Sequence, residues 1–288
     1  MRDKGNNNKN SNKGNLKFTA AVCQLKVTDN KTHNLNGAQK MIEEAALKGA
    51  DIIILPEMFN CPYDSTYFKR FSEDYPGETT GLLSMLAALH SVYIVGGSIP
   101  ECDKDKGRIY NTSYSFDRKG ALIGRHRKIH LFDVDVEGGI SFNESKTITA
   151  GSDMTVIETE FCKIGIAICY DMRFPELIRK MVLSGAQIIV VPAAFNMTTG
   201  SDHWRLLART RALDNQVYFI AASPARDKTA SYVAYGHSLV ANPWGDVISE
   251  ASEKEEIIIS EIDLGFVNKI RREFPLLKHR REDVYKTK

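Results

Sequence analysis

The chain has 288 residues, 43% of them hydrophobic and 26% charged, so it can bury the core of one large domain or of two smaller ones. A formal net charge of +2 excludes the strong electrostatic field that would favour nucleic acid or an anionic membrane as a partner. No apolar run approaches the length of a membrane span, so we expect no membrane-embedded segment.

The five cysteines also narrow the class of protein. Five is an odd number, and their spacing shows no pairing pattern and no Cys-x-x-Cys motif. We therefore expect free thiols and a reducing, cytoplasmic setting rather than a disulfide framework. The chain also opens without the pattern of a secretory leader. The five are Cys23, Cys61, Cys102, Cys162 and Cys169, and we expect the first four to be packing or incidental thiols.

The first 16 residues differ in composition from the rest of the chain. They are rich in Asn, Lys and Gly and contain almost no apolar side chains. Such a segment cannot bury enough surface to offset the entropy lost on ordering it. We expect a disordered arm over residues 1–16 and one folded domain over residues 17–288, which includes a basic C-terminal tail.

Beyond the arm, segments with strand and helix character alternate along the chain. We expect strands over 17–25, 51–55, 93–99, 110–117, 122–128, 155–159, 162–169, 187–192, 217–223, 236–241 and 247–259. We expect helices over 34–48, 80–90, 175–183 and 203–215, and at the start of 263–288. The alternation predicts an α/β fold, and the fully apolar strands predict sheets covered on both faces.

Cys169 stands where an apolar strand runs into the start of a helix, with Pro175 suited to the first helical turn. Free cysteines are usually small buried hydrophobes, but a thiol at a strand-to-helix corner faces a pocket. Backbone N–H groups and the helix dipole at such a corner favour a thiolate. The sequence therefore predicts Cys169 as a nucleophile.

A nucleophilic thiol needs a proton acceptor, and Glu57 is the best candidate. It follows a core strand directly after Pro56, and ligands of open α/β sheets gather at such strand ends. The alternative is a solvated loop carboxylate. Because apolar Leu55, Met58 and Phe59 surround Glu57, we expect desolvation to raise its pKa and make it a usable base.

Lys128 ends an alternating segment, and the alternation places it on the opposite side from Arg127. Arg125 and Arg127 are consistent with a solvated basic face. An ammonium among carboxylates can stabilise an oxyanion, so we expect Lys128 in the site. Glu144, beside Phe142, is a further carboxylate candidate.

The seven histidines offer a weaker alternative to Glu57. None lies in a recognisable Cys–His hydrolase motif, and spacing alone cannot choose one. His126 and His130 lie on either side of Lys128 in an extended segment, without the spacing of a metal site. We expect no metal and no catalytic histidine.

Three motifs together resemble the carbon–nitrogen hydrolase (nitrilase) superfamily: LPEMF at Glu57, RKIHLFD at Lys128 and GIAICYDMRFPEL at Cys169. Their order matches the Glu-Lys-Cys catalytic triad of that family. The resemblance implies a four-layer αββα sandwich, no metal or organic cofactor, and a homodimer or higher homo-oligomer. It also implies that Glu144 is the family's fourth polar residue, which orients the substrate or Lys128.

Two further segments are similar to a narrower group. Residues 194–204 resemble Nit-type amidases, and residues 222–232 resemble omega-amidases, which act on the terminal amide of 2-oxoglutaramate and 2-oxosuccinamate. This implies hydrolysis through a cysteine thioester with release of ammonia. Three alternatives stay open: another Nit-type or N-carbamoyl amidase, a nitrile hydrolase, or a noncatalytic binding or scaffold member.

The expected substrate contacts follow from that chemistry. The backbone N–H of Tyr170 is expected to help hold the oxyanion. Arg173 could bind the free carboxylate of a dicarboxylic monoamide, or form an ion pair with Asp171 or Glu176. Phe195 could line the acyl pocket or serve only in core packing.

Two further regions of the sequence allow more than one interpretation. Glu137 stands where the family leads us to expect a proline or a small residue, which leaves the shape of the pocket entrance undecided. The basic tail after residue 270 could lie solvated on the surface or wrap a partner subunit.

Overall fold

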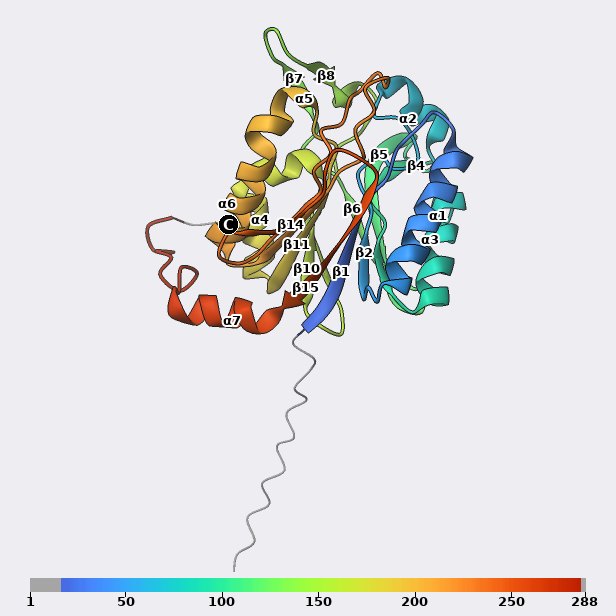
Figure 1. Cartoon of the computed structure of the whole chain (residues 1–288). Helices are drawn as coiled ribbons and strands as arrows, with labels where there is room; N and C mark the ends of the chain where they lie inside the picture. The colour runs from blue at the N-terminus through green and yellow to red at the C-terminus, as the bar shows by residue number, and fades with distance from the viewer. Residues whose placement is uncertain (1–16, 286–288) are drawn as a thin grey trace, which may run out of the picture.

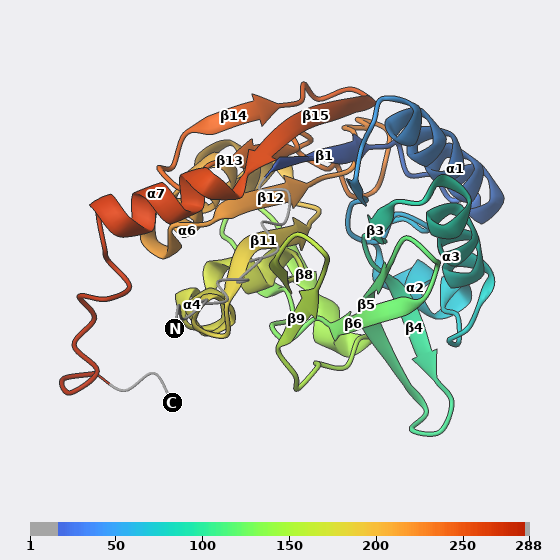
Figure 2. The ribbon, with the colours of Figure 1, turned by 90° about the horizontal axis from the view of Figure 1, so that it is seen from below.

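The computed structural model describes residues 17–285. The arm expected over residues 1–16 lies outside the described residues. Two large β-sheets face each other, and helices cover the outer face of each (Figure 1). Seen from below, α1 and α3 lie on one side of the sheets and α4 and α6 on the other (Figure 2). This is the expected four-layer αββα sandwich.

The first sheet has seven strands in the order β15-β1-β2-β3-β5-β4, with β6 paired to β5. Strands β1, β2 and β3 run parallel, and β15 is antiparallel to β1. The strands are β1 (Lys17–Gln24), β2 (Ile52–Ile54), β3 (Tyr93–Val95), β4 (Ile99–Asp103), β5 (Arg108–Phe116), β6 (Leu122–Arg127) and β15 (Glu256–Asp263). The helices on this side are α1 (Lys31–Leu47), α2 (Ser65–Phe71) and α3 (Glu78–His90).

The second sheet has six strands in the order β14-β13-β12-β11-β10-β9, and β10, β11 and β12 run parallel. They are β9 (Thr155–Glu158), β10 (Lys163–Ile166), β11 (Ala186–Pro192), β12 (Tyr218–Ala222), β13 (Leu239–Ala241) and β14 (Val247–Glu250). Helices α4 (Pro175–Leu183) and α6 (Arg205–Asn215) cover it, and α7 (Leu264–Glu273) follows β15. A small hairpin is formed by β7 (Asp133–Asp135) and β8 (Ser141–Asn143).

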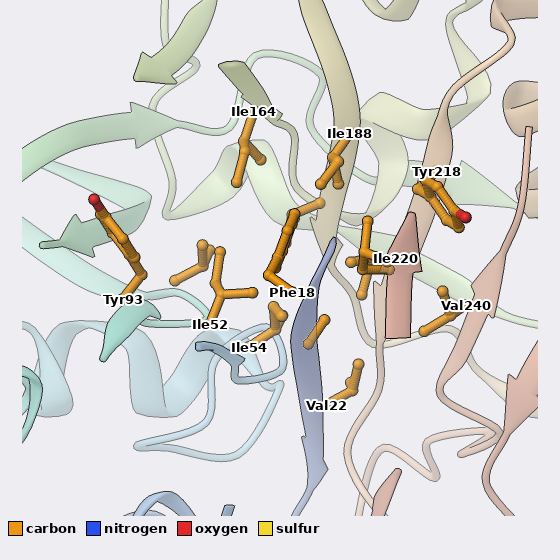
Figure 3. Packing of buried hydrophobic residues seen from close by; sticks show 14 of the residues in the cluster. Phe18, Val22, Ile52, Ile54, Tyr93, Ile164, Ile188, Tyr218, Ile220 and Val240 are labelled. Carbon is orange, nitrogen blue, oxygen red and sulfur yellow. The ribbon is translucent and has the colours of Figure 1, made fainter. Parts of the chain in front are cut away.

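The period-two pattern of the strands builds the layers. In β1, Phe18 and Val22 face the second sheet, whereas Ala21 and Cys23 pack with the residues under α1 and α3. Isoleucines from both sheets meet in between, such as Ile52 from β2 (Figure 3). We call this apolar layer the inter-sheet core. It holds the two sheets together along their facing sides.

Most expected elements exist, and the 175–183 helix has the expected bounds. The single strand expected over 93–99 is wrong. The chain turns at Gly97, whose φ is +57°, and a Cβ there would lie 2.1 Å from the Pro56 carbonyl oxygen. Strand β4 then begins at Ile99. Because Ser98 N–H donates to that same carbonyl and its Oγ accepts from Met58 N–H, this turn holds both sides of Glu57.

The single strand expected over 247–259 is also wrong. Its first part, β14, pairs with β13 in the second sheet, and its last part belongs to β15, which pairs with β1 in the first. The chain therefore changes sheets between residues 251 and 255. The 162–169 strand is shorter than expected and ends at Ile166, and α6 begins at Arg205, after a π-helical turn over Gly200–Trp204. The sequence analysis missed α2, α5 (Met197–Thr199), β4, β7 and β8.

The C-terminal segment is helical at first, as expected, and irregular from residue 274 to 285. Phe274 packs against Trp244, and Leu277 packs against the cluster under α4 and α6. Its role at a partner subunit stays a prediction. No helix among residues 17–285 is long and apolar enough to cross a membrane.

Candidate active site

Glu57, Lys128 and Cys169 follow β2, β6 and β10, and their side chains meet at one end of the sandwich. At that end the β7–β8 hairpin, α2 and α5 (Met197–Thr199) gather, at the top of Figure 1. The first sheet supplies the carboxylate and the ammonium, and the second supplies the thiol.

A buried ionic cluster forms the first-sheet side of the site. Lys128 Nζ lies 2.8 Å from Glu57 Oε1, 2.8 Å from Glu144 Oε2 and 3.0 Å from the Tyr63 hydroxyl. Asn111 Nδ2 donates to both carboxylates, at 2.8 Å to Glu57 and 3.1 Å to Glu144. The Lys128 side chain and both carboxylates are fully buried. Glu144 therefore lies in direct contact with Lys128.

The carboxylates of Glu57 and Glu144 share the Lys128 ammonium, and this arrangement shifts the pKa values of Glu57 and Lys128. Burial raises the pKa of Glu57, as does the Glu144 carboxylate, while Lys128 lowers it, and the net direction is upward. Burial lowers the pKa of Lys128, but Glu144 and Glu57 outweigh it and raise the pKa well above its usual value. Both carboxylates thus favour the charged form of Lys128, and the raised pKa of Glu57 is of the kind that a general base needs.

Cys169 begins a 3₁₀ turn over Cys169–Arg173 and has a φ of +46°, in the left-handed region that few non-glycine residues adopt. Burial, followed by the Glu57 carboxylate, raises the pKa of its thiol well above the usual value. The expectation that the corner favours a thiolate is therefore wrong, because burial and the Glu57 carboxylate outweigh the opposing effects of the Lys128 ammonium and the Ala194 backbone. The direction of this pKa shift favours the neutral thiol over the thiolate.

The thiol lies beside the group that can deprotonate it, since the Cys169 and Glu57 side chains interact directly. Glu57 Oε1 already accepts from Lys128 and Asn111. Glu57 Oε2 is buried and receives no hydrogen bond of standard geometry from residues 17–285. One carboxylate oxygen is thus held in place while the other is left to accept a proton.

A small pocket opens beside the thiol, with a free volume of about 10 Å³, which is room for about one water molecule. A larger cavity of about 390 Å³ lies on the Glu57 side. Tyr232 lines both, and its hydroxyl donates to the Ala194 carbonyl at 2.6 Å. The predicted substrate residues Tyr170, Arg173 and Phe195 all line the small pocket with Cys169.

Arg173 does not form the alternative ion pair with Asp171 or Glu176. Its Nη1 donates to His203 Nδ1 at 3.2 Å, and the guanidinium lies over the Phe195 ring at 4.9 Å from the centroid. Its Nε is buried without a hydrogen-bond partner among residues 17–285. Phe195 lines the small pocket and also packs on Trp204.

Sequence analysis missed several residues of the site: Tyr63, Asn111, Asp171, Asn196 and Tyr232. Asn196 lines the small pocket, and its Nδ2 is buried without a partner in the part of the chain described. Asp171 lies within hydrogen-bond distance of both His126 and His130. In the sequence, the signal for these two histidines was their position two residues before and two residues after Lys128. No such signal exists for Asn111, because it lies inside a segment that was recognised only as a strand, from the pattern of its apolar residues.

The remaining candidates are Glu137 and four cysteines, of which Cys61 lines the larger cavity together with Glu57. Glu137 is exposed at the tip of the β7–β8 hairpin and lines neither cavity. Cys23, Cys61 and Cys162 are buried free thiols, and Cys102 is half-buried. Within residues 17–285, no group of three or more His, Cys, Asp or Glu residues is arranged to hold a metal ion.

Comparison with known proteins shows which protein family the chain belongs to. A family model described as carbon-nitrogen hydrolase matches residues 19–272. The chain is 51% identical to omega-amidase NIT2 of Danio rerio over 269 residues, which cover 93% of this chain and 96% of that protein. It is 49% identical to omega-amidase NIT2 of Homo sapiens, over 93% of this chain and 96% of that one. The crystal structure of Saccharomyces cerevisiae Nit3, from branch 10 of the nitrilase superfamily, aligns with a TM-score of 0.86 and 43% identity, covering 92% of this chain and 97% of that one. The chain belongs to the carbon–nitrogen hydrolase family.

Proposed function

We propose that this enzyme is an omega-amidase, which hydrolyses the terminal amide of small 2-oxo dicarboxylic monoamides and releases ammonia. The observation that carries the proposal is the buried cluster in which the Cys169 thiol lies beside a carboxylate and an ammonium, on a pocket that contains Arg173. Identity of about half to omega-amidases of fish and human over nearly the whole chain supports the substrate class.

In the first step, Glu57 Oε2 accepts the thiol proton and the sulfur attacks the amide carbon. The carbonyl electron pair moves onto oxygen, and the Lys128 ammonium and the Tyr170 N–H stabilise the resulting oxyanion. Removing one such donor typically costs about 2.7–4 kcal/mol of transition-state stabilisation. Since the pKa of Lys128 is raised well above its usual value, this ammonium stabilises charge and does not serve as the proton donor.

In the second step, protonated Glu57 gives its proton to the amide nitrogen and the carbon–nitrogen bond breaks. Ammonia departs, and the acyl group remains bound to Cys169 as a thioester. Glu57 then takes a proton from water, which attacks the thioester carbon. Collapse of that intermediate releases the carboxylic acid and returns the proton to the thiol. Glu144 and Asn111 keep Lys128 and Glu57 in place throughout. No step needs a cofactor.

The substrate contacts follow from the donors around the small pocket. We assign the free carboxylate of the substrate to Arg173, whose buried Nε lacks a partner among residues 17–285, and one wall of the acyl site to Phe195. The free volume next to Cys169 is smaller than such a substrate. The bound substrate would therefore extend past Tyr232 toward the larger cavity that Glu57 lines.

The decisive experiment measures ammonia released from 2-oxoglutaramate, glutamine, asparagine, a simple aliphatic amide, an N-carbamoyl compound, deaminated glutathione and benzonitrile. We expect the largest kcat/KM for 2-oxoglutaramate. Preference for deaminated glutathione or the N-carbamoyl compound would replace the proposal with another amidase. Turnover of none of them, with Cys169 unreactive to iodoacetamide, would indicate a noncatalytic binding protein.

Arg173→Lys tests the carboxylate contact. We expect a higher KM for 2-oxoglutaramate, because a lysine ammonium lacks the planar fork that pairs with a carboxylate. The aliphatic amide, which has no carboxylate, is the matched control and keeps its KM. Equal KM values for 2-oxoglutaramate in the variant and the wild type would remove Arg173 from substrate binding.

We also propose a cytoplasmic homodimer or higher homo-oligomer with one folded domain over residues 17–288 and no nucleic-acid or membrane partner. The net charge of +2 and the five free cysteines support this setting. Light scattering on the purified full chain measures the oligomeric state, and a monomer at assay concentration would contradict it.

A further inference from the structure

Asp171 is a buried carboxylate that none of the proposed chemical steps uses. It lies two residues after Cys169 in the same 3₁₀ turn, and its side chain is fully buried. Its two oxygens accept four hydrogen bonds. Oδ1 accepts from the backbone N–H of His130 at 2.9 Å and from His130 Nδ1 at 2.7 Å; Oδ2 accepts from Ile168 N–H at 3.0 Å and from His126 Nε2 at 3.2 Å.

The donors come from the two halves of the site. Ile168 immediately precedes Cys169, so its bond closes the corner that carries the thiol. His126 and His130 lie two residues before and two residues after Lys128, so their bonds hold the segment that carries the ammonium. One carboxylate therefore joins a turn of the second sheet to a strand end of the first.

The histidines are themselves held from their other sides. His126 is buried, and its Nδ1 lies 3.1 Å from Thr155 Oγ1. The His130 ring stacks on Phe174, with centroids 3.6 Å apart and planes 9° from parallel. Burial raises the pKa of Asp171, but the bonds from His126 and His130 outweigh it and hold that pKa well below its usual range. The carboxylate therefore stays charged and accepts from every donor around it.

We propose that Asp171, with His126 and His130, is a positioning bridge that sets the place of the Cys169 thiol relative to the Lys128 ammonium. The inference rests on the proposed function in one respect, that turnover needs both groups in one geometry. Asp171 touches neither reacting group and acts through the backbone on either side. A displacement of about 1 Å at a reacting atom can cost about 100-fold in rate.

Asp171→Asn tests the bridge, because it keeps the shape of the side chain but replaces one acceptor oxygen with an NH₂ that faces N–H donors. We expect kcat for 2-oxoglutaramate to fall by about 10- to 100-fold, and KM to change by no more than about threefold. Alkylation of Cys169 by iodoacetamide, followed by mass spectrometry of its peptide, should slow as well. Alkylation requires no substrate, so it tests the bridge even if the wild type hydrolyses none of the amides.

Glu73→Gln is the matched control for loss of a buried charge. Glu73 accepts from Thr79 N–H at 2.8 Å and pairs with Lys31 at 2.7 Å, so it also joins separate segments. It lines neither cavity. We expect Glu73→Gln to lower the melting temperature while kcat and the alkylation rate stay at the wild-type values. Asp171→Asn should lower both rates in protein that circular dichroism shows to be folded.

Two variants of His130 supply a rescue. Asn at position 130 keeps an N–H donor close to where Nδ1 lies, whereas Leu keeps bulk and removes the donor. We expect His130→Asn to retain most of kcat and His130→Leu to lose it. Wild-type kcat and alkylation in folded Asp171→Asn would overturn the inference. Equal kcat in the two His130 variants, or losses of kcat in Asp171→Asn and Glu73→Gln that follow only their melting temperatures, would overturn it too.

Discussion

The inter-sheet core and the active-site cluster are both buried, but the first consists of apolar side chains and the second of charged and polar ones. Between the sheets, buried residues such as Ile52, Ile164 and Ile188 pack without polar partners. At the end of the same sheets, Glu57 and Lys128 are buried just as completely and bind one another. The apolar layer depends on volume and pattern, whereas the polar cluster depends on each partner.

This difference decides how each region responds to a substitution. A conservative change between the sheets loses a few contacts and leaves every remaining group satisfied. Removing one partner from the cluster leaves a buried charge, and this typically costs about 3–5 kcal/mol. We therefore expect kcat to be sensitive to substitutions in the active-site cluster and insensitive to conservative substitutions in the inter-sheet core.

Cys169→Ala should give the largest effect. With the nucleophile gone no thioester can form, so we expect kcat for ammonia release to fall by more than about 1000-fold. The side chain is small and in a pocket, so the far-ultraviolet circular dichroism should match that of the wild type. Full activity in folded Cys169→Ala would end the proposed mechanism.

Lys128→Met comes next, because it keeps the length of the side chain and removes the cation that Glu57 and Glu144 share. We expect kcat to fall by about 100- to 1000-fold and the unfolding free energy, from urea titration, by about 3–5 kcal/mol. Lys163→Met is the control, since that lysine is half exposed and pairs with an exposed Glu158. A stability loss no larger than that of the control would mean that the cluster does not need its cation.

The same contrast explains what the sequence could predict. The inter-sheet core follows from local periodicity, and the 175–183 helix, with Pro175 in its first turn, needs no distant partner. Glu57, Lys128 and Cys169 could be found because each follows a strand and lies in a family motif. Asp171 and Asn111 could not, because their roles depend on donors and acceptors that other strands bring to them.

The strand errors have the same origin. Within residues 247–259, the first part pairs with β13 and the last part pairs with β1 in the other sheet. Both parts consist of strand-like residues, so the local sequence does not show that the chain changes sheets between them. The turn at Gly97 is likewise set by the approach of the Pro56 carbonyl, from a loop some 40 residues away. The direction of the Cys169 pKa was misjudged because a sequence shows the helix start but not the degree of burial.

The pH dependence of activity tests the electrostatics of the buried cluster. The base must be ionised, and burial raises the pKa of Glu57, so kcat/KM should fall with decreasing pH at a value above the usual glutamate pKa of about 4.3. Because Glu57, Glu144 and Lys128 are coupled, the fall reports an apparent pKa of the cluster. A pH–rate profile for 2-oxoglutaramate measures it, with circular dichroism at each pH as the control for unfolding. An acid limb at or below about 4.3 would contradict a desolvated base.

Ile188→Val should give the smallest effect and is the complementary test. Ile188 is 1% exposed in the inter-sheet core, so removing one methylene should lower the unfolding free energy by about 0.5–1.5 kcal/mol. Because the neighbours are apolar and stay satisfied, the ends of β10 and β11 should keep their places and kcat should equal that of the wild type. Urea titration and ammonia release on the same preparation measure both. A variant that kept its stability but lost kcat would show that the volume of the inter-sheet core determines the active-site geometry. The inter-sheet core and the active-site cluster would then respond to substitution together and not independently.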